Sequence, residues 1–257
     1  MRTEAVALSS SLETALERLH ARGMGLRRAS EAPGPERARP SVPTGHAALD
    51  AALGNGGWPR GALAALDATP GSGATTLALG TLAAAQAVGG LAAWIDLSAT
   101  FDPAVAERLG IDLGWLLVVR PVDAREAIEL AGWLARGGLI DAFALDLGGE
   151  AAPRTALDRL ATFMARGSSV GLMTGGASSP ASVRVALERQ AWLAAGRDLV
   201  GQRVTATVTR HRWGAIGGSA ELDLWFGEGR RIDPLLMAAA EPRQAVEARP
   251  ALRVIGA

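Results

Sequence analysis

The sequence of 257 residues contains no cysteine. A chain without cysteine has no disulfide framework, no thiol nucleophile and no cysteine-based metal site, and it suits a reducing compartment. Its three histidines, His20, His46 and His211, lie far apart and have no carboxylate cluster at ligand spacing beside them. We therefore expect no metal site, and we expect the protein to be cytoplasmic.

Lysine is also absent, so all 26 basic residues are arginine, and 26 acidic residues balance them. With a net charge of zero, no global field draws the chain to nucleic acid, although a local patch still can. Missing lysine together with abundant alanine and glycine indicates GC-rich coding, which replaces lysine by arginine wherever only the charge matters. If a motif position that normally holds lysine contains neither lysine nor arginine, the positive charge at that position was not kept.

Long apolar runs are missing too. No run reaches the ~18 to 20 residues that a membrane span needs, and the N-terminus lacks a basic region followed by an apolar core. We expect a soluble protein without a signal peptide. A hydrophobic fraction of 49% predicts a packed core and excludes disorder of the whole chain.

The first 40 residues form an amphipathic pattern followed by a linker. Leu12, Leu16 and Leu19 lie at helical spacing, and residues 27–43, "RRASEAPGPERARPSVP", are rich in Pro and Arg without an apolar period. The helix either folds back on its own core or places these leucines in a partner's groove. We predict three parts: residues 1–40, a core over 41–236 and a flexible tail over 237–257.

Strands and helices alternate through the core, which predicts an α/β doubly wound, mostly parallel sheet with helices on both faces. Nearly continuous apolar runs predict buried strands at 61–67, 91–97, 115–121, 141–147 and 169–175. Helical patterns lie between them at 75–89, 102–110, 124–137 and 154–167. Closely spaced, more alternating segments at 189–196, 202–212 and 219–227 predict antiparallel strands at one edge.

The segment "ATPGSGAT", residues 68–75, lies between the first predicted strand and helix and resembles a phosphate-binding loop. Such a loop follows GxxxxGK[ST], where glycines turn amides toward the phosphates, lysine reaches the β and γ oxygens, and Ser/Thr binds Mg²⁺. Gly73 and Thr75 match, whereas Ala68 and Ala74 replace the first glycine and the lysine. By itself, this string also fits an ordinary tight turn.

Alanine at position 74 is informative because coding drift elsewhere turned lysine into arginine. The charge itself was dispensable, although losing it removes a contact that phosphoryl transfer depends on. A nearby arginine would compensate, but the sequence identifies none.

With its surroundings, the loop resembles the RecA recombinase core. The residues that carry this resemblance are "PTGHAALDAALGNGGWPRGALAAL", "AAWIDLSATFDPAVAERLGIDLGWLLVVRP", "AREAIELAGWLARGGLIDAFALDLGG", "ASVRVALERQ", "RVTATVTRHR" and "AELDLWFGEGRRID", roughly residues 41–233. The N-terminal "LETALERLHARGMGLRR" is similar to the RecA segment that docks on the neighbouring protomer. The resemblance implies a RecA-type fold.

The resemblance also implies a vestigial ATP/Mg site. Its residues would be Gly71, Ser72, Gly73, Thr75, Thr76 and, as the Walker B aspartate, Asp146. Ser98 stands where RecA has the glutamate that activates water, and glycine in "LMTGG" replaces the polar switch residue. The two DNA-binding loops of RecA shrink to "DLGGEAAPRTALD" and "TGGASSPASV". We therefore expect no cofactor, no catalysis, and weak or absent direct DNA binding.

The segment "ALDAALGNGGWPRGAL", residues 48–63, followed by this degenerate loop, resembles the ImuA family of DNA-damage-inducible (SOS) mutagenesis cassettes. That family implies a non-catalytic role in translesion synthesis, in contact with an ImuB-type polymerase-like protein and RecA, and indirectly with a DnaE-type error-prone polymerase at the nucleoid. The alternative is a weak ATP-binding or ATP-hydrolysing repair protein of the RecA/RadA/KaiC group.

Two further sets of residues are candidates for partner contacts. Arg210 and Arg212, in "TRHRWG", match the basic pair that reaches the neighbour's nucleotide in RecA filaments, and they also suit a solvated strand edge. In the tail, Leu252, Val254 and Ile255 would add to a partner's sheet edge or groove, or belong to a disordered end.

Overall fold

The computed structural model describes residues 39–174, 180–195 and 197–226, and the backbone of residues 241–244. No helix in these ranges is long and apolar enough to cross a membrane. The predictions for Leu12, Leu16 and Leu19, for the glycine that follows Thr174, and for Leu252, Val254 and Ile255 fall outside the described residues.

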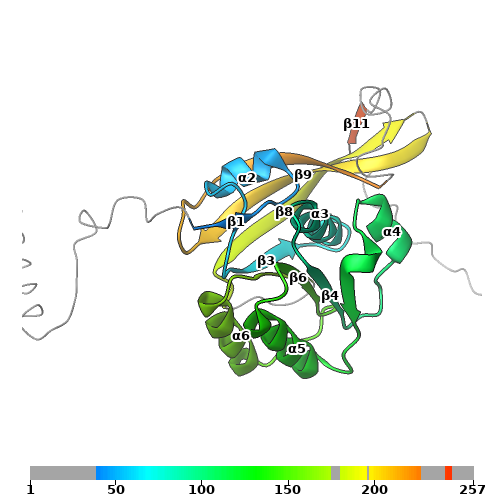
Figure 1. Ribbon diagram of the computed structural model, residues 1–257. Coiled ribbons are helices and arrows are strands. Elements are labelled where there is room, and N and C mark those ends of the chain that lie inside the picture. Colours follow the sequence, from blue (N-terminus) through cyan, green and yellow to red (C-terminus); the bar gives the residue numbers. More distant parts are fainter. Residues whose placement is uncertain (1–38, 175–179, 196, 227–240, 245–257) are drawn as a thin grey trace, which may run out of the picture. The chain divides into compact units, whose positions relative to one another are not determined.

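A nine-stranded mixed sheet forms the centre of the core (Figure 1), with the strand order β10-β9-β8-β3-β7-β6-β4-β5 and with β11 on β8. Its strands are β3 (Leu63–Ala68), β4 (Ala92–Asp96), β5 (Leu116–Val119), β6 (Ala142–Asp146), β7 (Val170–Thr174), β8 (Val183–Ala195), β9 (Asp198–His211), β10 (Ser219–Trp225) and β11 (Glu241–Gln244). Strands β5, β4, β6, β7, β3 and β8, neighbours in the sheet in this order, run parallel to one another. Strand β9 is antiparallel to β8 and to β10, and β11 is antiparallel to β8. The predicted α/β class and its antiparallel edge are confirmed.

Helices cover both faces of the sheet because the parallel strands are apolar on both sides. The helices of the crossovers are α3 (Ala74–Ala87), α4 (Pro103–Arg108), α5 (Ala124–Gly137) and α6 (Arg154–Arg166), and a short 3₁₀ helix, η2 (Leu113–Trp115), precedes β5. In β4, Trp94 faces the core beneath α3, and its neighbour Ile95 faces the core beneath α5 and α6. Side chains that alternate between the two faces of each strand therefore contribute to two separate hydrophobic cores, one on each face of the sheet.

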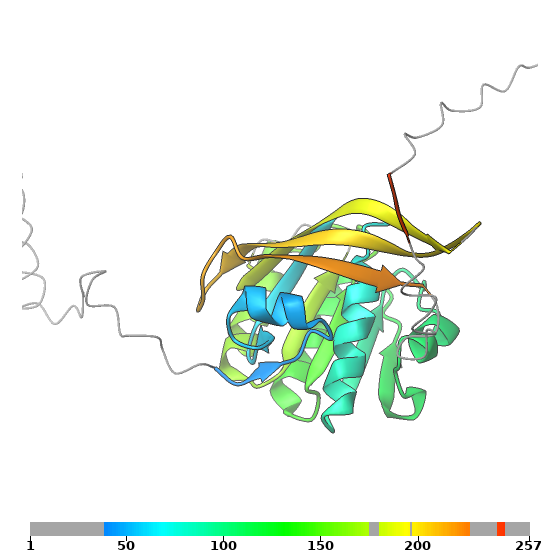
Figure 2. The same cartoon turned by 90° about the horizontal axis from the view of Figure 1, so that it is seen from above.

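A small unit that the sequence did not predict precedes β3. It consists of β1 (Ser41–Val42), α2 (Ala47–Leu53) and β2 (Trp58–Pro59), and α2 lies against β9 and β10 (Figure 2). The indole Nε1 of buried Trp58 donates to Thr81 Oγ1 (3.1 Å), and Thr81 Oγ1 donates to the carbonyl of Thr44 (3.1 Å). This buried chain of hydrogen bonds fixes the unit to α3, the helix that carries the loop.

The antiparallel edge is longer than predicted. β8 begins at Val183, six residues before the predicted Arg189, and its residues 183–187 pair with β3. Beyond the end of β3, β8 continues, and residues 191–194 pair with β11, within the segment predicted as a tail. A strand that outlasts its neighbour leaves free N–H and C=O groups, and β11 pairs with them.

Candidate functional site: a degenerate nucleotide pocket

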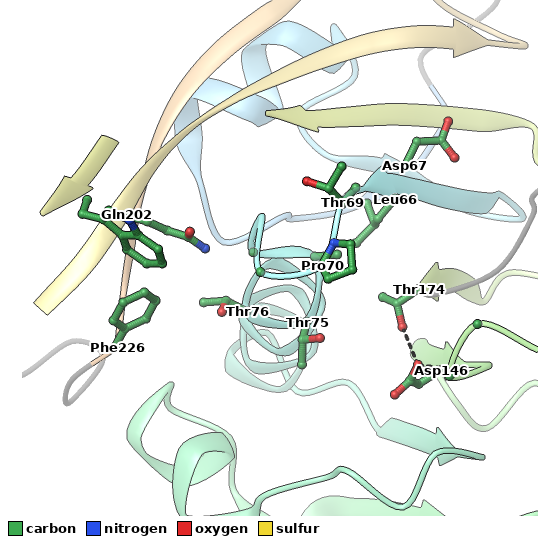
Figure 3. Close-up of a pocket in the computed structure, with 17 residues that line it drawn as sticks. Leu66, Asp67, Thr69, Pro70, Thr75, Thr76, Asp146, Thr174, Gln202 and Phe226 are labelled. Atoms are coloured by element: carbon green, nitrogen blue, oxygen red, sulfur yellow. Dashed lines mark hydrogen bonds between the residues drawn. The ribbon is translucent and has the colours of Figure 1, made fainter. Parts of the chain in front are cut away.

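The loop between β3 and α3 opens into a pocket of about 860 Å³ (Figure 3). The predicted residues Gly71, Gly73, Thr75, Thr76 and Asp146 all line it. Ser72, the remaining predicted residue, is buried in the loop, where its hydroxyl lies 2.6 Å from that of Thr69. The structure therefore brings the predicted loop residues and the Walker B aspartate together.

Two glycines give the loop its shape. Gly71 and Gly73 have φ angles of +80° and +90°, a region that other residues rarely adopt. A Cβ at Gly73 would also overlap the side chain of Leu224 and lie 2.8 Å from Gln202 Nε2. Gly73 is the N-cap of α3, so the positive end of a 14-residue helix meets the pocket. This backbone retains the features that bind an anion at a helix N-terminus.

Asp146 is already surrounded by donors of the protein itself. Its Oδ2 accepts a hydrogen bond from Ser98 Oγ (2.7 Å), and the hydroxyl of Thr100 lies 3.3 Å from the same oxygen. Its Oδ1 accepts from Thr174 Oγ1 (3.3 Å) and from the amide of Gly148 (3.1 Å). Three hydroxyl groups and one amide thus solvate a carboxylate that a metal-binding site would leave open to the cation.

Strand register explains this arrangement. Asp96, Asp146 and Thr174 are direct partners at the ends of β4, β6 and β7. Buried Asp96 accepts the amides of Thr100 (3.0 Å) and Phe101 (3.2 Å), which folds the turn after β4 back toward Asp146. Ser98 lies in that turn, so the residue in the expected glutamate position donates a hydrogen bond to Asp146.

The opposite side of the pocket contains residues that the sequence interpretation missed. Trp192 of β8 and Phe226 pack edge to face with their ring centroids 6.1 Å apart, and Gln202 of β9 lies beside them. In Figure 3, Gln202 and Phe226 lie on one side of the start of α3, whereas Asp146 and Thr174 lie on the other. One signal was available for Gln202: it occupies an inward position of an otherwise apolar alternating strand.

Gln202 is only 3% exposed, and its Oε1 has no hydrogen-bond partner among the described residues. A buried amide oxygen without a donor costs about 1–3 kcal/mol. Any ligand in this pocket that brings an N–H or O–H to Gln202 would therefore recover part of that cost.

Few charged side chains line the pocket. Among the described residues, the charged side chains that line it are Asp67 and Asp146, and no cationic side chain does. Beside the pocket, Arg184 of β8 pairs with Asp67 at 3.3 Å. At the loop itself, Arg189 of β8 donates from Nη1 to the carbonyl of Gly71 (3.1 Å), and its guanidinium stacks on Trp192 at 4.2 Å. Arg189 is the arginine near the loop that the sequence did not identify.

No group of three or more His, Asp or Glu side chains that could hold a metal ion occurs among the described residues. Of the residues predicted for the nucleotide site, Asp146 is the one with a carboxylate, and its oxygens accept hydrogen bonds from Ser98 and Thr174.

Arg210 and Arg212 lie away from this pocket. Both are exposed, on either side of buried His211. That they share one side of a strand stays a prediction, because Arg212 lies one residue beyond the end of β9. The amide of Arg212 donates to the carbonyl of Ser182, whose own amide donates to Leu63 at the start of β3. The loop follows the other end of this six-residue strand, about 20 Å away at ~3.3 Å per residue.

Comparison with known proteins agrees with this geometry. Residues 15–176 match the family model of the RecA N-terminal domain. Protein RecA of Clavibacter michiganensis subsp. michiganensis is 35% identical over 263 residues, which cover 85% of this chain and 72% of that protein. Protein RecA of Bifidobacterium longum is 31% identical over 263 residues, covering 86% of this chain and 66% of that protein. That of Bifidobacterium breve is 32% identical over 228 residues, covering 73% and 58%.

The chain thus spans from 58% to 72% of the length of these three relatives. Among solved structures, the crystal structure of the RadB recombinase aligns with a TM-score of 0.57 over 73% of this chain and 97% of that chain. At 19% identity this likeness shows the fold alone. The family model matches more than half of the chain, and the three relatives are more than 30% identical to it. The chain therefore belongs to the RecA family.

Proposed function

We propose that this protein is a non-catalytic RecA-like accessory protein of the ImuA type. It would act in DNA-damage-induced translesion synthesis through contacts with an ImuB-type polymerase-like protein and with RecA, and indirectly with a DnaE-type polymerase. The observation that carries the proposal is the internal solvation of Asp146 by Ser98, Thr174 and the amide of Gly148, combined with alanine at position 74.

Hydrolysis of ATP needs a cation on the phosphates, a metal on the Walker B carboxylate and a base for water. Ala74 supplies no charge, and the hydroxyl of Ser98 has no basic lone pair comparable with that of a carboxylate. To bind Mg²⁺, Asp146 would have to exchange hydrogen bonds from its own chain for metal contacts. All three requirements are weakened together, which favours a binding role and no obligatory cofactor.

Arg210 and Arg212 suit a contact with another protomer. They are exposed and lie about 20 Å from their own loop, at ~3.3 Å per strand residue, so they are available to a partner's nucleotide instead. The protein would bind one end of a RecA filament in this way, and its own pocket would not support the next addition.

A pull-down tests the proposed RecA contact. With RecA held on single-stranded DNA by a non-hydrolysable ATP analogue, Arg210→Ala with Arg212→Ala should lower retention of this protein at least tenfold. The matched control is Arg166→Ala with Arg197→Ala, which removes two other exposed arginines and should leave retention unchanged. Equal retention of both double variants would refute the contact.

The alternative function, a weak ATP-binding or ATP-hydrolysing repair protein, is favoured by one observation. Arg189 lies at the loop, and its guanidinium contacts the carbonyl of Gly71. Calorimetry with ATP and Mg²⁺ separates the two functions. A micromolar affinity with measurable turnover, both lost in Arg189→Gln, would establish the alternative. Absence of turnover in the wild type and in the variant is the result that we expect.

A further inference from the structure

Helices α5 and α6 pack side by side on the face of the sheet opposite α3 (Figure 1), and a groove of about 490 Å³ runs between them. Its floor is apolar, because Ile128 of α5 and Leu160 of α6 are core residues that also line it. At Gly132 the absence of a side chain brings α5 close to the ring of Phe163; a Cβ there would lie 3.4 Å from Cδ2. The groove therefore has a narrow, preformed apolar base.

An aromatic side chain and an arginine form one rim. Trp133 is 70% exposed, an unusual position for a large apolar side chain in the middle of a helix. The guanidinium of Arg136 lies 5.5 Å from the Trp133 ring centroid and 4.6 Å from that of Phe163, and its Nε donates to the carbonyl of Gly132 (3.2 Å). These contacts orient Arg136 before any partner arrives, which lowers the entropy cost of binding.

The charges around the groove are unbalanced although the whole chain is neutral. Arg125, Arg136 and Arg159 line it against one carboxylate, Glu129, which pairs with Arg125 at 3.1 Å. Neither Arg136 nor the exposed Arg159 has an ion pair among the described residues. Arg136 and Arg159 thus flank an apolar groove, and no carboxylate of the described residues neutralises either guanidinium group.

We propose that this groove binds an acidic peptide segment of a partner protein. One apolar side chain of the segment would rest on Ile128 and Leu160 beside Trp133, and its flanking carboxylates would pair with Arg136 and Arg159. From Arg125 to Arg136, the helix presents about 16 Å of groove at 1.5 Å per residue, the length of three helical turns. Charge complementarity selects an acidic segment, and the apolar base selects one with a large hydrophobic residue.

Single-stranded nucleic acid also combines negative charge with planar groups, but the groove suits it less well. A strand needs a continuous basic track with successive stacking surfaces. Here the exposed aromatic surface is that of Trp133, Arg136 already lies over its ring, and the carboxylate of Glu129 stands on the same rim. The site is independent of the nucleotide pocket, which lies at the start of α3.

A displayed library of random 12-residue peptides, selected on the full chain, tests the proposal. We expect enriched peptides with at least two Asp or Glu residues around a Leu, Phe or Trp. Measured by fluorescence anisotropy, the strongest of them should lose at least tenfold in affinity with Arg159→Glu and with Trp133→Ala. Both residues are exposed, and circular dichroism is expected to show that both variants stay folded.

The matched control is Arg166→Glu, the same charge reversal on an exposed residue of α6 outside the groove, which should leave peptide affinity within twofold. Selection of no peptide, or of peptides that bind Arg159→Glu as well as wild type, would overturn the proposal. So would a fluorescent dT20 oligonucleotide whose affinity falls with Trp133→Ala while the selected peptides are unaffected, because the groove would then serve nucleic acid.

Discussion

At the end of β4, the hydroxyl of Ser98 lies 2.7 Å from Asp146 Oδ2, and the hydroxyl of Thr100 lies 2.8 Å from that of Ser98. A glutamate at position 98 would bring a second negative charge beside Asp146, where like charges destabilise each other. Serine instead donates a hydrogen bond to the aspartate. At the scale of single residues, the hydroxyl of Ser98 thus joins the turn after β4 to Asp146 at the end of β6.

Replacing Ser98 by Ala should therefore lower stability. A hydrogen bond to a charged group contributes about 1.5–3 kcal/mol, and Thr100 is close enough to replace part of it. We expect a loss of about 1–2 kcal/mol in the free energy of unfolding, measured by urea denaturation, on the basis of that range.

Ser219→Ala is the control, because its hydroxyl is exposed and makes only a 3.3 Å contact with Thr207. It should change the free energy of unfolding by less than about 0.5 kcal/mol. Equal effects of the two substitutions would mean that Ser98 does not stabilise Asp146.

At the scale of elements, two hydrogen bonds of Thr81 join the short unit before β3 to α3. Trp58 and Thr81 are fully buried, and the Thr81 hydroxyl both accepts from the indole and donates to the carbonyl of Thr44. Apolar packing alone would not fix the rotation of α3 relative to this unit, since that helix is apolar on most sides. The hydrogen bonds supply that specificity.

Thr81→Val keeps the shape of the side chain and removes both hydrogen bonds. Because an unpaired buried polar group costs about 1–3 kcal/mol, leaving the indole and the carbonyl unpaired should cost about 2–4 kcal/mol in unfolding free energy. Thr155→Val, an exposed site on α6, is the matched control and should change it by less than about 0.5 kcal/mol. A result for Thr81→Val as small as that of the control would contradict the role of this network.

At the scale of the whole molecule, two histidines make stability depend on pH. Burial lowers the pKa of His46, with partial opposition from Asp50, and burial also lowers the pKa of His211. The Nδ1 of His211 accepts the amide of Trp213 (3.2 Å), so protonation would also remove this acceptor. Both rings are held neutral in the folded protein at pH values where the unfolded chain is already protonated.

A lowered folded-state pKa means that the unfolded state binds more protons, so stability falls as pH drops below the unfolded value of about 6.5. Each histidine contributes at most about 1.4 kcal/mol per pH unit in this range. Urea denaturation at pH 7.5 and 5.5 should show lower stability at pH 5.5. His211→Asn, whose amide oxygen can accept from Trp213, should reduce the difference. An unchanged difference in this variant would exclude His211 as a contributor.

The order of the buried strands and helices could be predicted from the sequence because apolar period and turn residues are local properties. The five central strands were predicted to within a residue or two at their ends, and the loop at Gly73 was located correctly. The unit around α2 was missed because its two strands have only two residues each. Arg189, Gln202 and Trp192 were missed because they come from distant strands that meet the loop only when β8 and β9 join the sheet.

By itself, the sequence determined the α/β class, the position of the loop and the departures from the RecA pattern at Ala74 and Ser98, since each depends on residue type and neighbours along the chain. Tertiary structure alone decided what those residues now contact. Register at the ends of β4, β6 and β7 turned Ser98 and Thr174 toward Asp146, and packing of α5 against α6 assembled a groove beside Trp133 and Arg136. Such contacts join residues about 25 to 50 positions apart, and only the folded chain brings them together.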